Sequence, residues 1–346
     1  MKPQSYSSQQ KIIAICDDET GYACHMMEYL KRRTSLPYEV NVFTSTEKLL
    51  RYAPEERVLL LVISESEYAR GLQDRNYDPI LILNESDRYL GGDMPVNISK
   101  YQSMKVIADR IAEIISERED YVPASIRHGP PMKIIGVYTP VTRCLQTTFS
   151  LTLGQLLSEN HKALYLNFEN YSGLDIMLGR MFKGSAADLL YYNECAREKV
   201  AVQLSSMVEN INGLDFIPPM RSFIELRSIR ARQWLDLFHT IEQVTEYEYL
   251  ILDLTEATDG LLEILRACDE VYMIEREDAL SQARIRHYEL LLRENEYEDI
   301  CLKMYRWKFP VFHELPATLE YLTHGEFSDY IRKKWNESHR RPAVGY

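Results

Sequence analysis

The sequence predicts an α/β protein built from two doubly wound parallel-sheet domains. Short apolar runs alternate with segments of helical periodicity along most of the chain. Two such series are separated by residues 117–132, which lack apolar periodicity and contain three Pro and one Gly. The length of 346 residues suits two domains of ordinary size.

The first series predicts five strands, each an apolar run of four to six residues. The run at 58–63 is apolar throughout, which is typical of a parallel strand covered on both faces. We expect strands at residues 11–16, 39–43, 58–63, 79–83 and 95–98. We expect helices at 22–33, at 46–52 with Thr46 as the N-cap, and at 103–118 as an amphipathic closing helix.

The second series has the same alternation. We expect strands at residues 133–138, 163–168, 214–217, 249–254 and 270–274, helices at 147–158 and 233–245, and a mostly helical tail from 279. The predicted organisation is a disordered N-terminus (1–10), a first domain (11–118), a linker (119–132), a second domain (133–335) and a tail (336–346).

Charge and cysteine content narrow the class of protein. The formal net charge of -12 counts against a general nucleic-acid binder, which needs a basic surface. No apolar run approaches the ~18 residues of a membrane span. Six scattered cysteines without CxxC spacing fit a reduced, cytoplasmic compartment.

The first domain resembles response-regulator receiver domains over residues 11–118. Asp17 and Asp18 match the acidic pair after the first strand, and Lys100 matches the lysine after the fifth. The phosphoacceptor position falls at Ile63-Ser64 and holds no aspartate, while the strand-four position is near Asn84. Without the nucleophile we expect no phosphoryl transfer, and the resemblance implies a receiver-like fold kept for docking or dimerisation.

Residues 134–148 follow a strand and open a helix, where a phosphate loop would lie. They resemble the deviant Walker A loop of MinD/ParA-type ATPases. Val141 stands at the signature lysine position and Gln146 at the P-loop lysine position; Thr147 and Thr148 survive, and Arg143 is the one basic residue left to face a phosphate. The alternative is an ordinary β-α turn in which Thr147 or Thr148 caps the helix.

Later segments resemble further MinD/ParA landmarks. Asn167 and Glu169 stand where the family has paired aspartates, and residues 247–253 resemble the Walker B strand with Asp253 in the Mg²⁺ position. Asp253 would bind Mg²⁺ only if nucleotide binds, so ATP with Mg²⁺ is a candidate cofactor and none is certain. Residues 173–190 and 213–218 also match the family pattern.

A receiver-like domain without a phosphoacceptor followed by a MinD/ParA-like domain is similar to the TadZ/CpaE family. That resemblance implies a cytoplasmic localisation or scaffold protein of Flp-type pilus or secretion machinery, at a cell pole or the membrane periphery, homodimeric and with protein partners. The altered loop predicts a pseudo-ATPase, because Val141 and Gln146 remove both lysine charges.

Three alternatives stay open. One is a nucleotide-dependent switch ATPase that uses Arg143 as its cation. Another is a receiver-type signalling module, or a DNA-binding module. The DNA-binding module would use the arginines of residues 221–232, which helical winding does not gather on one face. A third is peripheral membrane contact through Phe327, Ile331 and Trp335, although we expect this stripe to pack on its own domain.

Overall fold

The computed structural model describes residues 12–32, 39–53, 57–72, 77–86, 96–116 and 131–339. The chain divides into two compact units, one built on residues 1–127 and the other on the rest, with the short segments 196–206 and 243–245 grouped with the first. The sheet of the first unit is parallel and that of the second is parallel except at one edge, so the predicted α/β fold class is confirmed. The predicted N-terminal segment 1–10 and most of the predicted linker 119–132 lie outside the described residues.

The first unit holds a five-stranded parallel sheet in the order β2-β1-β3-β4-β5. This is the flavodoxin-like order, in which the direction of winding reverses between β1 and β3. The strands are β1 (Ile12–Cys16), β2 (Glu39–Phe43), β3 (Val58–Ser64), β4 (Ile80–Asn84) and β5 (Val96–Ser99), and the helices are α1 (Thr20–Arg32), α2 (Thr46–Tyr52), α3 (Glu65–Ala69) and α4 (Met104–Ser116).

The apolar runs become the three interior strands, because β1, β3 and β4 are buried along their whole length. The N-cap prediction for α2 was wrong. Ser45 caps the helix and accepts from Lys48 N, whereas the Thr46 hydroxyl donates to the buried Glu67. Ser has the same capping chemistry as Thr, so the sequence alone did not distinguish these neighbours.

The second unit holds a seven-stranded sheet in the order β12-β11-β6-β10-β7-β9-β8. All its strand pairs are parallel except β8 with β9, which is antiparallel. The strands are β6 (Lys133–Val137), β7 (Ala163–Asn167), β8 (Glu209–Ile211), β9 (Leu214–Ile217), β10 (Tyr249–Asp253), β11 (Glu270–Glu275) and β12 (Met304–Lys308). The two edge strands, β8 and β12, were not predicted.

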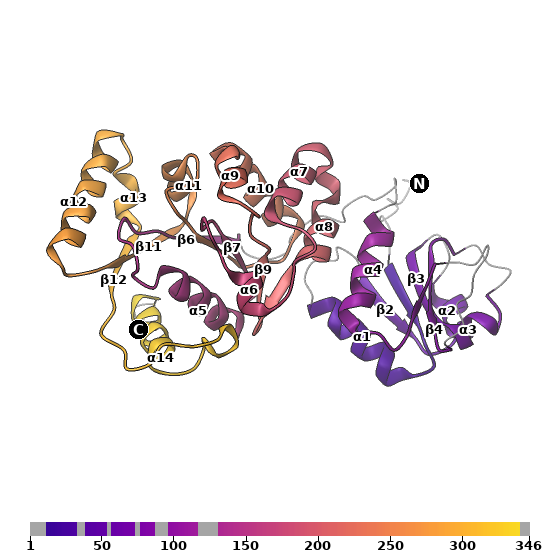
Figure 1. Cartoon of the computed structure of the whole chain (residues 1–346). Coiled ribbons are helices and arrows are strands. Elements are labelled where there is room, and N and C mark those ends of the chain that lie inside the picture. The colour runs from indigo at the N-terminus through magenta and orange to yellow at the C-terminus, as the bar shows by residue number, and fades with distance from the viewer. Residues whose placement is uncertain are drawn as a thin grey trace, which may run out of the picture. The chain divides into compact units, whose positions relative to one another are not determined.

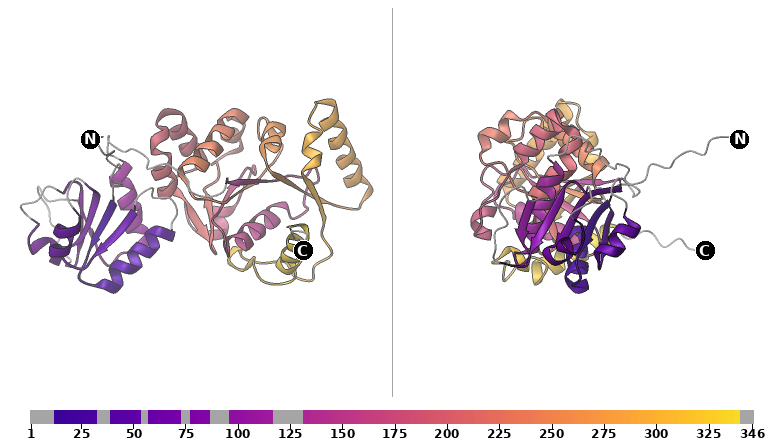
Figure 2. Two further views of the ribbon diagram at one scale, coloured as in Figure 1. Left: turned by 180° about the vertical axis from the view of Figure 1, so that it is seen from behind. Right: turned by 90° about the vertical axis from the view of Figure 1, so that its right-hand side faces the viewer.

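Helices cover both faces of this sheet. In Figure 1, α5 and α14 lie on one side, and α9, α10 and α11 on the other; Figure 2 shows the same two layers from behind. The helices of this unit are α5 (Gln146–Ser158), α6 (Leu174–Leu178), α7 (Ala186–Cys195), α9 (Phe223–Ser228), α10 (Ala231–Val244), α11 (Leu261–Ala267), α12 (Ala279–Glu294), α13 (Asp299–Leu302) and α14 (Glu326–His339). Nearly all of α8 (Val200–Met207) lies in the segment grouped with the first unit.

The arginine-containing segment 221–232 and the C-terminal helix differ in part from what the sequence predicted. Residues 221–232 do not form one helix, because Ile229 is extended and separates α9 from α10. The C-terminal helix α14 extends past the predicted boundary at 335 and buries Phe327 and Ile331 completely. In the described part of the chain, no helix has both the length and the hydropathy needed to cross a membrane.

Candidate functional site

The predicted phosphate loop lies at the carboxyl end of β6, next to the carboxyl ends of β10 and β11. Its first residues are tied to β11: Tyr138 N donates to Tyr272 O at 3.0 Å, and the Thr139 hydroxyl donates to Ile274 O at 2.8 Å. Val141, at the signature lysine position, is buried. The loop therefore turns an apolar side chain inward at the position where the resemblance places a cation.

Two non-glycine residues in this loop adopt left-handed backbone conformations. Arg143 has φ 57° and Leu145 has φ 65°. Residues with a Cβ rarely adopt such conformations, because the Cβ crowds the backbone. Successive residues that alternate between αR and αL can form a concavity of backbone amides that binds anions. Here the thiol of Cys144 lies inside the loop and donates to Val141 O, with 3.2 Å between Sγ and O.

The thiol of Cys144 is buried. Burial raises its pKa to about 11, although the backbone amides of Gln146 and Cys144 bond to the sulfur and oppose that rise. The thiol is therefore protonated at neutral pH.

Gln146 bonds the loop to the end of β10. Its Nε2 donates to Asp253 Oδ1 at 2.7 Å and to Leu254 O at 2.9 Å. Asp253 is fully buried, and among the described residues no lysine or arginine forms an ion pair with it. Burial raises the pKa of Asp253. A neutral amide thus occupies the position where the resemblance places a lysine.

The second oxygen of Asp253 is bonded from β7. The Tyr165 hydroxyl donates to Oδ2 at 3.0 Å, and Asn167 Nδ2 lies 3.4 Å from the same oxygen and 2.7 Å from the Tyr165 oxygen. Tyr165 was not among the predicted site residues. Its place two residues before Asn167, on the same face of a strand, is the signal that could have identified it.

Glu169 follows β7 and faces the same carboxylate. Burial, and then the negative charges of Asp253 and Glu256, raise the pKa of Glu169 to about 7. A hydrogen bond from Thr147 acts in the opposite direction. Glu169 therefore titrates near neutral pH at the edge of the Asp253 network.

The prediction that Thr147 or Thr148 caps the helix after the loop was wrong. Leu145 is the N-cap of α5, and no described side chain caps the helix there. Thr147 and Thr148 instead lie within the first turn and are half-buried. Because Leu145 is left-handed, the helix begins at Gln146 and the Thr147 side chain points toward Glu169 and Asp253.

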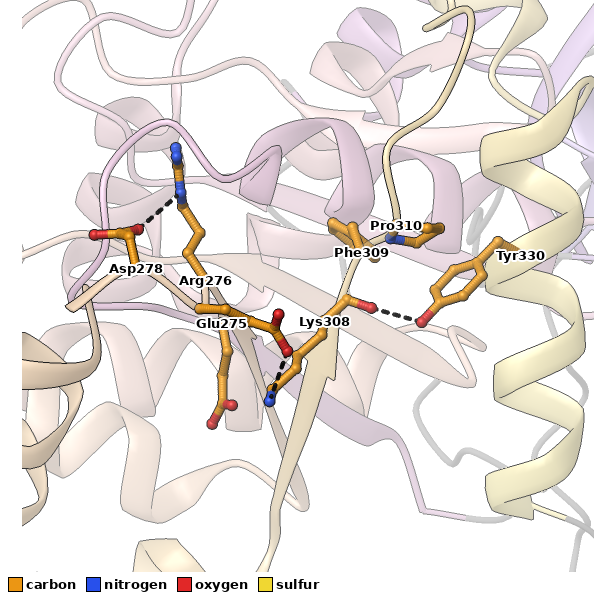
Figure 3. Close-up of a pocket in the computed structure, with 8 residues that line it drawn as sticks. Glu275, Arg276, Asp278, Lys308, Phe309, Pro310 and Tyr330 are labelled. Atoms are coloured by element: carbon orange, nitrogen blue, oxygen red, sulfur yellow. Dashed lines mark hydrogen bonds and ion pairs between the residues drawn. The ribbon is translucent and has the colours of Figure 1, made fainter. Parts of the chain in front are cut away.

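A cavity of about 530 Å³ lies at the carboxyl ends of β11 and β12. Figure 3 shows Arg276 and Asp278 on one side of it and Tyr330 on the other. Arg276 pairs with Asp278 at 3.4 Å, and the charge of Arg276 also acts on Cys144 in the loop. The sequence prediction missed this cavity, although four charged residues after a buried strand (275–278) were a usable signal.

In the first unit, the structure brings Lys100 and Asp17 together. Both are buried, and Lys100 Nζ lies 2.9 Å from Asp17 Oδ2, 3.2 Å from Glu19 Oε1 and 3.1 Å from Glu85 Oε1. Burial opposes the charge of Lys100, but its carboxylate partners outweigh that effect and raise its pKa. The ammonium group neutralises a carboxylate cluster that the sequence predicted only in part, since Glu19 and Glu85 were not among the predicted residues.

The other predicted residues of this cluster have separate partners. Ser64 accepts from Glu67 N and caps α3. Asn84 donates to Asn97 Oδ1 at 3.1 Å, and Asp18 pairs with Arg70 at 3.4 Å. Carboxylate oxygens of Asp17, Asp18 and Glu85 still come within 4.8 Å of one another. The phosphoacceptor position thus holds a helix cap and no nucleophilic carboxylate.

Several solved structures are similar to this chain. A ParA family ATPase from Chlorobium tepidum is 19% identical over 51% of this chain and 73% of its own, with a TM-score of 0.42. A putative plasmid partition protein from Borrelia burgdorferi, bound to AMPPNP, is 16% identical over 59% and 96%, with a TM-score of 0.43. The MinD cell division protein of Aquifex aeolicus is 14% identical over 51% and 68%, with a TM-score of 0.36. No protein-family model and no curated protein matches the sequence.

Proposed function

We propose that this chain is a non-catalytic scaffold or localisation factor of the TadZ/CpaE kind, serving Flp-type pilus or secretion machinery through protein contacts and as a homodimer. The observation that carries the proposal is the bond from Gln146 to Asp253, 2.7 Å long. It places a neutral amide where phosphoryl transfer needs a cation to stabilise developing charge.

The residues at this site do not fit a nucleotide-bound Mg²⁺ ion. Mg²⁺ takes carboxylate oxygens as ligands in a nearly octahedral shell. Asp253 is fully buried, and both of its oxygens accept hydrogen bonds from protein side chains, namely Gln146, Tyr165 and Asn167. A metal would have to displace these donors.

The test is ATP turnover by the full chain with Mg²⁺. We expect no phosphate release above that of a sample without protein. Turnover that is lost in the Asp253→Ala variant would contradict the proposal. Genes for a secretion ATPase and small prepilins beside this gene would support the pilus assignment, and their absence would leave a scaffold of unassigned machinery.

The first unit supports the same kind of role. Its fold positions a buried Lys100–Asp17 pair, but the phosphoacceptor position is occupied by Ser64, which caps α3. We propose that this unit docks or dimerises and takes no phosphoryl group. Incubation with a small phosphoryl donor such as acetyl phosphate should leave its mass unchanged.

One observation favours a second candidate, a nucleotide-responsive switch. Arg143 is exposed on the loop, and the Arg276-lined cavity lies close by. A thermal shift of a few degrees with ATP, lost in Arg143→Ala and retained in Arg286→Ala on α12, would support this candidate. The scaffold proposal predicts no shift with or without Mg²⁺.

A further inference from the structure

The segment after β7 exposes an unusual number of large apolar side chains. Tyr171 is 84% exposed, Ile176 82%, Met177 57% and Met181 94%. All four lie within eleven residues, on and around α6. Single exposed apolar residues are ordinary, but a local group of this size marks an interaction surface.

The geometry of α6 explains why these side chains face outward. Leu174 and Leu178, four residues apart, share the face that packs on the core. Ile176 therefore projects from the opposite face. Gly173 and Gly179, with φ 65° and 61°, bound the helix on either side and fix this orientation, since the left-handed region favours glycine.

We infer that this α6 surface, defined by Tyr171, Ile176, Met177 and Met181, binds the same surface of a second copy of the chain about a two-fold axis. The inference deepens the proposed homodimeric scaffold and rests on it. Side chains of this size expose apolar area on the order of 500 Å², a large part of the ~800 Å² that each partner contributes to a standard interface. The ring of Phe223 on α9 contacts Tyr171 at 6.1 Å between centroids and leads to Ile224, which is also exposed.

The charges of the segment are complementary to their own two-fold image. Residues 175–183 carry one acid, Asp175, followed by two bases, Arg180 and Lys183, so the exposed part of the segment is acidic at one end and basic at the other. A two-fold axis through α6 sets one copy antiparallel to the other, which places the acidic end of each segment against the basic end of its partner. Arg180 also pairs with Glu209 at 3.2 Å but stays partly exposed, with further guanidinium donors available.

The experiment measures the mass of the full chain by sedimentation velocity between about 1 and 100 μM. We expect dimers for the wild type and at least tenfold weaker association for Ile176→Glu/Met181→Glu. The matched control is Leu302→Glu/Val311→Glu, which adds the same charge at residues 91% and 96% exposed elsewhere in the same unit and should leave the dimer intact. The four substituted residues are exposed, and so are Asp175 and Lys183, which are substituted in the experiment below. Tryptophan fluorescence checks that each variant is folded.

A charge exchange tests the two-fold geometry. Asp175→Lys and Lys183→Asp should each weaken the dimer, and the double variant should recover it. A wild-type monomer at 100 μM, a dimer that survives Ile176→Glu/Met181→Glu, or a double exchange without recovery would each overturn the inference, as would a monomer that binds anionic vesicles through these residues. ATP turnover would remove the scaffold proposal without changing these masses, so the two failures are distinguishable.

Discussion

Replacing Gln146 by leucine tests whether the Asp253 network is closed to water. Gln146→Leu keeps a similar volume but removes the donors to Asp253 Oδ1 and Leu254 O. A buried acceptor that loses its donor costs about 1–3 kcal/mol, and more when it is charged. We therefore expect the second unit to lose about 3 kcal/mol of unfolding free energy.

Tryptophan fluorescence isolates the unit in which this loss occurs. The three tryptophans of the chain, Trp234, Trp307 and Trp335, all lie in the second unit. With a urea dependence of about 2 kcal/mol/M, the unfolding midpoint should fall by about 1.5 M. The matched control is Gln282→Leu, whose amide also donates to a carbonyl, Arg276 O at 2.7 Å, but in an exposed setting. We expect less than about 0.5 kcal/mol there.

A midpoint for Gln146→Leu equal to that of Gln282→Leu would refute the reasoning. It would mean that water satisfies Asp253 and Leu254 once the amide is gone. The donor set around Asp253 would then be replaceable, and the misfit of a metal ion described above would no longer hold.

Three further predictions concern titration and buried charge. The folded pKa of Glu169, about 7, lies above the ordinary 4.5, so the unfolding free energy of the wild type should fall as pH rises from 4.5 to 7. In urea unfolding at pH 8, Glu169→Gln should have an unfolding free energy about 1–2 kcal/mol higher than the wild type. Equal pH profiles of stability for the two proteins would contradict this. Lys100→Met leaves Asp17 buried without its cation and should cost the first unit about 3–5 kcal/mol, seen as faster hydrogen exchange in residues 12–116, with partial recovery when Asp17→Asn is added. His339→Phe should cost about 1 kcal/mol at pH 5–6 and less at higher pH, because the bond to Glu270 raises the pKa of His339 and its contribution is lost as pH rises through that pKa; a loss independent of pH would point to packing alone.

The strands that the sequence predicted best are those buried on both faces. Residues 58–63 form β3 because every side chain there is apolar and a central parallel strand has no solvent face. The edge strand β12 was missed because Arg306 and Lys308 interrupt its apolar pattern, which an edge strand tolerates. Periodicity therefore identified the centre of each sheet and not the edges of the second.

The sequence predicted the location of the candidate site better than the contacts within it. Gln146, Asn167 and Asp253 do meet, because parallel strands deliver their carboxyl ends to one edge of the sheet. Val141 points into the core and Cys144 into the loop, and neither direction follows from spacing. Side-chain direction in a left-handed turn depends on the backbone, which only the structure supplies.

The thiol of Cys144 gives the loop a chemical reporter of its own opening. A buried thiol with a pKa of about 11 is protonated at neutral pH and out of reach of alkylating reagents. Cys195 is exposed and provides an internal reference for reagent access. The ratio of alkylation at these two cysteines therefore measures how often the loop exposes its own sulfur, and any partner that reshapes the loop will change that ratio without an engineered cysteine.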